Sequence, residues 1–82
     1  MPSPDVPLST LALGTEATIS RVDGEARDPV ARRLADLGFL AGTRVTALRR
    51  APTGDPTIYE LRNYQMCLRR READRVLVRA AV

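Results

Sequence analysis

The chain has few side chains that could act on a substrate or hold a metal ion. It contains no histidine and one cysteine, Cys67, which follows Met66. These two are soft metal ligands, but neighbouring residues on a strand point to opposite faces, and a transition-metal site needs three or four ligands. The carboxylates Asp23, Glu25 and Asp28 lie close together in one acidic loop, but their spacing matches no metal motif. We therefore expect no metal site and no cofactor.

An enzyme is also not expected. General acid–base catalysis most often uses histidine, and the chain has neither a glycine-rich phosphate loop nor a nucleophile beside a base. We predict that the protein has no catalytic residue and acts by binding.

The charge of the chain is unevenly distributed. All 13 basic residues are arginine, which we interpret first as a compositional bias. Residues 1–36 hold four arginines and six acids, whereas residues 37–82 hold nine arginines and four acids. The densest run is Arg69, Arg70 and Arg71. A solvated strand edge that resists pairing is the default interpretation, and the functional alternative is electrostatic contact with an acidic protein surface or the membrane face.

Three aromatic residues accompany the arginines and suggest a second class of function. Phe39, Tyr59 and Tyr64 would allow a small basic barrel to bind nucleic acid, because bases stack on aromatic side chains. A stacking platform needs aromatic residues that are adjacent on one face, and the strand pattern points Tyr59 inward. We therefore keep nucleic-acid binding as the alternative hypothesis and do not expect it.

The element that must position these groups is a helix that begins after Asp28. The Asp28 carboxylate can accept backbone N–H groups of the first turn, and Pro29 suits the first helical position. Val30, Leu34 and Leu37 then follow at spacings of four and three, which places them on one apolar stripe. We expect this stripe to face the core.

The helix ends at a glycine. Gly38 is typical of a left-handed helix C-terminus, and Phe39 or Leu40 can fold back onto the last turn. Gly42 is expected to adopt positive φ in the turn that follows. One helix in so small a domain cannot bury every apolar residue here, so we expect Phe39 and Leu40 to be partly exposed.

The rest of the chain predicts a mostly β domain of about five short strands. Alternating patterns place strands at 15–22, 43–50 with a bulge near Leu48, 57–62, 65–69 and 75–79. A rigid hairpin loop is expected at 51–56, a tight turn at Asn63 and Tyr64, and a short helical turn at 70–74. Leucines at 8–13 suggest one helical turn that covers the end of the core. We expect a mobile or extended arm at residues 1–7 and a single domain at 8–82.

Composition limits the location of the protein. No apolar run reaches the roughly 18 residues of a membrane-spanning helix, and no charged-then-apolar leader follows Met1. We expect a cytoplasmic protein.

Three segments together resemble a known family. They are R-L-A-D-L-G-F-L-A-G-T at 33–43, A-P-T-G-D-P at 51–56 and C-L-R-R-R-E-A-D-R-V-L-V at 67–78. In this order and spacing they resemble the FeoA family, ferrous iron transport protein A, over roughly residues 8–78. The family usually has proline where Ala41 stands and often glycine where Asn63 stands.

The resemblance implies a fold and a partner. The fold is a small SH3-like barrel with one α-helix inserted after the first strand and a short helical turn before the last, similar also to the C-terminal domain of DtxR-type iron-dependent repressors. The function is that of an accessory protein of bacterial Fe²⁺ uptake that binds FeoB, a membrane permease with a cytoplasmic GTPase domain. Binding to FeoB could hold the protein at the inner face of the cytoplasmic membrane. Self-association through exposed barrel edges stays open.

Our hypothesis for the FeoB-binding surface combines the helix with the arginine run. Its residues are Leu34, Leu37, Phe39, Leu40, Arg69, Arg70 and Arg71. Leu34 and Leu37 are also the natural core residues of the helix, and that alternative stays open at this point.

Overall fold

The computed structural model describes residues 5–25 and 27–80 of the chain. Its elements are β1 (Val6–Pro7), the 3-10 helix η1 (Leu8–Thr10), β2 (Glu16–Val22), α1 (Pro29–Asp36), β3 (Arg44–Arg50), β4 (Thr57–Leu61), β5 (Tyr64–Leu68), α2 (Arg70–Ala73) and β6 (Val76–Ala80). The predicted α-helix and the predicted helical turn before the last strand are both confirmed.

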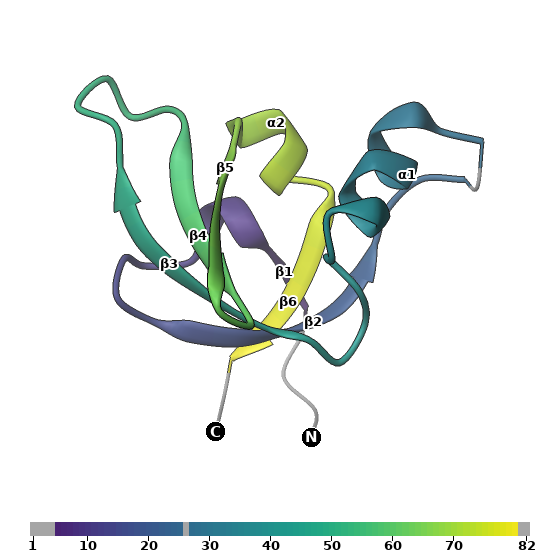
Figure 1. Cartoon of the computed structure of the whole chain (residues 1–82), viewed down its shortest axis with the longest axis horizontal. Coiled ribbons are helices and arrows are strands. Elements are labelled where there is room, and N and C mark those ends of the chain that lie inside the picture. Colours follow the sequence, from purple (N-terminus) through teal and green to yellow (C-terminus); the bar gives the residue numbers. More distant parts are fainter. Residues whose placement is uncertain (1–4, 26, 81–82) are drawn as a thin grey trace.

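The strands form one antiparallel sheet in the order β1-β6-β2-β3-β4-β5. Figure 1 shows the sheet bent around on itself, with α1 beside one end and α2 over the upper opening. α1 packs on β2, and α2 packs on η1. This arrangement is the small barrel that the sequence predicted, and it leaves β1 and β5 as its two edges.

Two irregularities bend the sheet. The pairing of β3 with β4 shifts register between Ala47 and Arg49, which confirms the bulge predicted near Leu48. The pairing of β2 with β6 shifts between Ile19 and Arg21. Because a bulge increases the local bend and twist of a strand, these shifts help a short sheet to close around its core.

The core consists of the inward-facing residues of each strand and one face of each helix. The fully buried members are Leu8, Ala17, Ile19, Leu34, Phe39, Val45, Ala47, Tyr59, Leu61, Leu68, Ala73, Val76 and Val78. The strand members recur at every second position, as expected for strands with one buried face. Leu8 confirms that the leucine-rich turn covers the end of the core.

One strand lies where the sequence predicted an arm. Val6 and Pro7 pair with Val78 and Leu77 of β6, which makes six strands instead of five. These two residues are therefore extended and paired, which fits the extended form of the expected arm and not the mobile one, while residues 1–4 lie outside the described residues. A two-residue strand next to proline has no alternation that a sequence pattern could detect.

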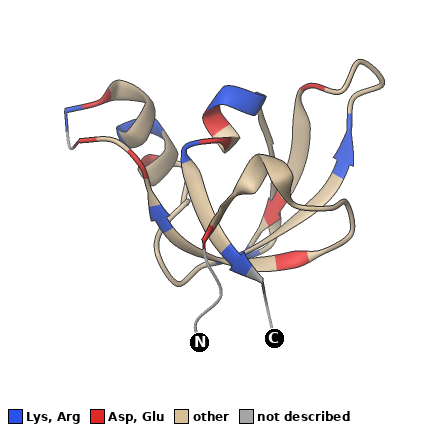
Figure 2. Cartoon of the chain, turned by 180° about the vertical axis from the view of Figure 1, so that it is seen from behind, with Lys and Arg blue, Asp and Glu red and all other residues tan. Residues whose placement is uncertain are grey.

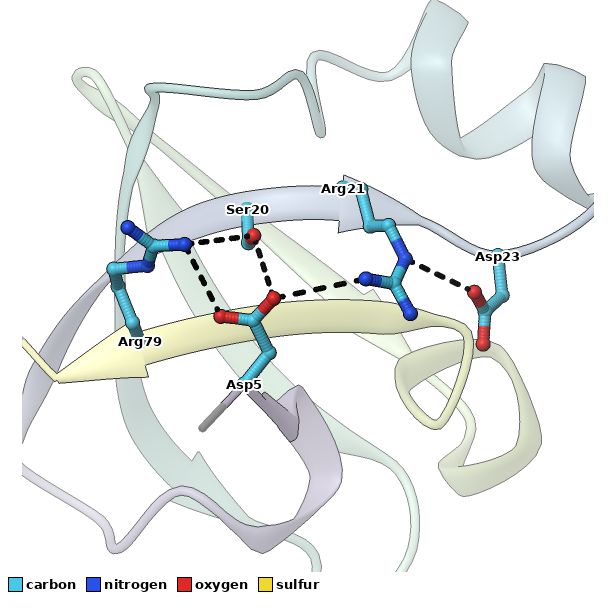
Figure 3. A network of polar contacts seen from close by, with 5 residues as sticks. All are labelled: Asp5, Ser20, Arg21, Asp23 and Arg79. Carbon is cyan, nitrogen blue, oxygen red and sulfur yellow. Dashed lines mark hydrogen bonds and ion pairs between the residues drawn. The ribbon is translucent and has the colours of Figure 1, made fainter. Parts of the chain in front are cut away.

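A partly buried carboxylate fastens this strand to its neighbours. Asp5 accepts a hydrogen bond of 2.8 Å from the Ser20 hydroxyl and forms ion pairs with Arg79 at 3.4 Å and Arg21 at 3.7 Å (Figure 3). Arg21 also pairs with Asp23. Asp5 thus ties the start of the described chain to β2 and β6.

The predicted turn at Asn63 and Tyr64 is displaced by one residue. The turn residues are Arg62 and Asn63, and Arg62 has a φ of +46°. Tyr64 is already the first residue of β5 and pairs with Leu61. The hairpin between β4 and β5 therefore keeps a two-residue turn, shifted by one position, and it sets the position of Tyr64.

Candidate functional site

The α1 helix begins as its sequence predicts. The Asp28 side chain accepts hydrogen bonds from the backbone N–H groups of Val30 at 2.9 Å and Ala31 at 3.4 Å. The Arg75 guanidinium, from the residue before β6, also donates to Asp28. The bond from Arg75 is the main reason that the pKa of Asp28 lies below its ordinary value of 3.8; the two backbone bonds act in the same direction, and partial burial opposes them.

Asp28 should make the stability of the protein depend on pH. Its folded-state pKa is below the unfolded value, so its stabilising effect is complete above about pH 4 and is lost as the pH falls through the folded pKa. We expect Asp28→Ala to lower the free energy of unfolding at pH 7, and we expect this deficit to shrink below pH 4. Urea unfolding of the natural chain and of Asp28→Ala across pH 2–7 measures this difference in the free energy of unfolding.

A control variant distinguishes the loss of the helix-capping carboxylate from the loss of one negative charge. Asp36→Asn removes one negative charge from the exposed last residue of α1 and leaves the cap intact. This variant should show no comparable loss at pH 7. An Asp28→Ala deficit that stays constant from pH 7 to pH 2 would contradict the role assigned to the ionised carboxylate.

The α1 helix ends in a Schellman motif. Gly38 has a φ of +104°, its N–H donates to the Ala35 carbonyl at 3.0 Å, and the Phe39 N–H donates to the Leu34 carbonyl at 3.0 Å. This pattern normally brings the residue after the glycine onto the last turn of the helix. Phe39 follows it, because both Phe39 and Leu34 are fully buried.

The structure divides the predicted apolar surface into buried and accessible parts. Leu34 and Phe39 are core residues, so the expectation that Phe39 is partly exposed is wrong. Leu37 is half-buried at the edge of the core, and Leu40 is 47% exposed. The Schellman motif turns Phe39 inward, and the next side chain then lies outside.

Tyr64 joins these residues from a distant part of the chain. It is 42% exposed, and its hydroxyl donates to the Leu37 carbonyl at 2.5 Å. A side chain at Gly38 would displace that hydroxyl, and the positive φ at this position also favours glycine. We call Leu37, Leu40 and Tyr64 the α1-end patch. Sequence reasoning missed Tyr64, because no local signal links residues 27 positions apart.

The turn that carries Leu40 is held firmly. The Thr43 N–H donates to the Leu40 carbonyl at 3.0 Å, and the Gly42 N–H donates to the Ile19 carbonyl at 2.8 Å. The Ile19 N–H in turn donates to the Thr43 carbonyl at 2.8 Å. Gly42 has the predicted positive φ, at +89°. Leu40 is therefore presented by a turn that is hydrogen-bonded to the centre of β2.

The arginine run lies around α2, away from this turn. Arg69, Arg70 and Arg71 are exposed, and the carboxylate of Glu72 accepts a hydrogen bond of 3.0 Å from the Arg69 N–H. Glu72 also forms an ion pair with Arg33 of α1. Figure 2 shows basic segments on α1, on α2 and at the start of β6. The run thus belongs to a basic surface that several elements share.

The remaining chemical groups form no site. Cys67 is exposed and Met66 is half-buried, which agrees with opposite faces of β5. Among residues 5–25 and 27–80, no group of three or more acidic, cysteine or histidine side chains could hold a metal ion. Tyr59 points into the barrel, and burial raises its pKa. With Phe39 also buried, only Tyr64 of the three aromatics is available for base stacking.

The fold and this surface define a class of protein: a small barrel domain with an exposed apolar patch at the end of its helix. A family model described as the FeoA domain matches residues 6–80. The chain therefore belongs to the FeoA family, the accessory domains of ferrous iron transport. The expected SH3-like fold is confirmed by the FeoA of Stenotrophomonas maltophilia, a prokaryotic SH3 domain protein solved with zinc, with 37% identity, a TM-score of 0.79, and coverage of 94% of this chain and 91% of that one.

Other relatives agree with this family. A FeoA-like protein of Clostridium acetobutylicum has a TM-score of 0.88 at 28% identity, over 98% of this chain and 91% of that one. A Porphyromonas gingivalis protein is 37% identical over 71 residues, which is 87% of this chain. That relative is a fusion of Fe²⁺ transport protein A with the Fe²⁺ transporter FeoB, and this chain spans 8% of its length.

The similarity to metal-dependent repressors concerns the fold alone. A manganese-dependent transcriptional repressor has a TM-score of 0.81 at 21% identity, and this chain covers 44% of it. Within the part of the chain that the structure describes, neither α-helix has the length and apolar composition of a membrane span.

Proposed function

We propose that this protein is a cytoplasmic, non-catalytic regulator of Fe²⁺ uptake that binds FeoB through the α1-end patch. The observation that carries the proposal is Leu40, a large apolar side chain that is 47% exposed on a turn hydrogen-bonded to β2. Leu37 and Tyr64, which share a hydrogen bond, lie at the same end of α1. Tyrosine is enriched among binding hot spots, and well-packed contacts around a hot spot exclude water from it.

The fusion relative supports FeoB as the partner. In the Porphyromonas gingivalis protein the two functions are joined in one chain. Linking two modules raises their effective concentration to the millimolar range, which favours a contact of modest affinity. We infer that this domain makes the corresponding contact with FeoB. Fe²⁺ is then the cargo of the transporter and not a ligand of this domain.

The test is a calorimetric titration of this protein into the soluble GTPase domain of its FeoB. It is carried out with and without a non-hydrolysable GTP analogue, at low and high salt. We expect saturable binding that differs between the two nucleotide states. Because an apolar contact is not screened by salt, most of the affinity should persist at high salt.

Two results would contradict the proposal. One is the absence of binding to both the GTPase domain and the detergent-solubilised full-length transporter. The other is binding that disappears at high salt, which would move the contact from the α1-end patch to the arginines.

A further inference from the structure

A basic groove lies between α1 and α2. It has a volume of about 660 Å³ and is lined by Val30, Arg33, Arg69, Arg71, Glu72 and Arg75. Four guanidinium groups therefore surround one concave surface that holds a single carboxylate. Arginine presents a planar fork of donors that matches a carboxylate in bidentate geometry.

Two of the four arginines already have partners. Arg33 pairs with Glu72, and Arg75 pairs with Asp28 at the start of α1. Within residues 5–25 and 27–80, the guanidinium groups of Arg69 and Arg71 form no ion pair with an acidic side chain. Both residues are exposed. The groove therefore keeps two uncompensated positive charges, and its concave shape concentrates their field.

The neighbouring groove on the other side of these arginines differs in charge. It is lined by Arg69, Arg70 and Arg71 but also by Asp55 and Asp74, and the Asp55 carboxylate already accepts the Arg70 N–H at 2.9 Å. An anionic ligand would meet two carboxylates there and only one in the groove between the helices. The groove between α1 and α2 is the better site for negative charge.

The lining also indicates the shape of the ligand. The four arginines of the lining come from α1, from the residue before α2, from α2 itself and from the residue before β6, so several separate elements supply the positive charge of the groove. Val30 adds a half-buried apolar side chain to the same lining. A bilayer surface is flat on this scale and does not enter a groove between two helices.

We propose that this groove binds an extended acidic segment of a protein partner. Carboxylates on the face of the segment that enters the groove pair with Arg69 and Arg71. Alternate residues of an extended chain lie on one face, so the two carboxylates would occupy alternate positions of the segment. The inference does not depend on which protein supplies the segment, and it concerns a surface separate from the α1-end patch.

The experiment titrates the isotope-labelled full chain with a short synthetic peptide that alternates glutamate and valine, followed by amide NMR shifts. We expect saturable shifts confined to residues 30–33 and 69–75. The double variant Arg69→Gln with Arg71→Gln should bind the peptide about tenfold more weakly, as expected for the loss of two charge-assisted contacts of modest strength. Unchanged thermal unfolding of the variant shows that the fold is kept.

A matched pair of arginines serves as the control. Arg49→Gln with Arg62→Gln removes the same charge from exposed residues outside the groove and should change the affinity less than about twofold. Equal weakening by both double variants, or shifts spread over the whole surface, would overturn the proposal. Stronger shifts of the same amides with pyrophosphate or with phosphatidylglycerol vesicles than with the peptide would also overturn it.

Discussion

Phe39→Ala is expected to lower the free energy of unfolding by about 3–5 kcal/mol, the range for removal of a fully buried phenylalanine ring. Phe39 has no exposed surface and belongs to the same core cluster as Leu34. Its backbone N–H closes the Schellman motif, so the helix end cannot move freely to fill the cavity. The substitution should therefore leave most of the lost volume empty.

The effect is large for a chain of this size. Folded domains are stable by about 0.05–0.15 kcal/mol per residue, or roughly 4–12 kcal/mol here. Urea unfolding followed by circular dichroism measures the change, and Phe39→Leu should retain most of the stability because it leaves a smaller cavity. The neighbouring Leu40→Ala should cost less than about 1 kcal/mol, since Leu40 is half exposed. Equal losses in the free energy of unfolding for Phe39→Ala and Leu40→Ala would contradict the conclusion that Phe39 lies in the core and Leu40 at the surface.

Leu40→Gln should weaken binding to FeoB and leave the stability of the fold nearly unchanged. We expect thermal unfolding to change little, because Leu40 lies outside the buried core cluster and its backbone hydrogen bonds to Gly38 and Thr43 do not involve its side chain. Affinity for the FeoB GTPase domain should fall at least about tenfold, the loss expected when a polar group replaces an apolar residue in the centre of an interface. Calorimetry with the variant measures this directly.

Leu13→Gln provides the matched control. Leu13 is 46% exposed, almost the same as Leu40, and it belongs to the turn before β2. Figure 1 shows this turn far from the end of α1. This variant should bind as the natural chain does. If both variants weaken binding equally, the contact is not specific to the α1-end patch. If Leu40→Gln instead unfolds the protein, Leu40 belongs to the core and the patch loses its main residue.

Local signals in the sequence were sufficient to predict most of the helices and strands. The start of α1 at Asp28 and its end at Gly38 were predictable, because capping hydrogen bonds join residues at most five positions apart. The strands other than β1 were predicted from the alternation of apolar and polar residues. The bulge near Leu48 was predicted because Leu48 interrupts that alternation. The two-residue β1 was not predicted, because it pairs with Val78 and Leu77, which lie far along the chain. No pattern within a short window contains that information.

The surfaces were decided by the tertiary structure. Sequence alone identified an apolar run after α1 and an arginine run after β5, and so determined the kinds of contact that this protein can make. It could not separate Phe39 from Leu40, since both are large, apolar and adjacent, and burial depends on what packs against each. Only the fold brings Tyr64 to Leu37 and places Arg33 and Arg75 around the same groove as Arg69 and Arg71, because these residues come from elements that are distant in the chain and meet only when the barrel closes.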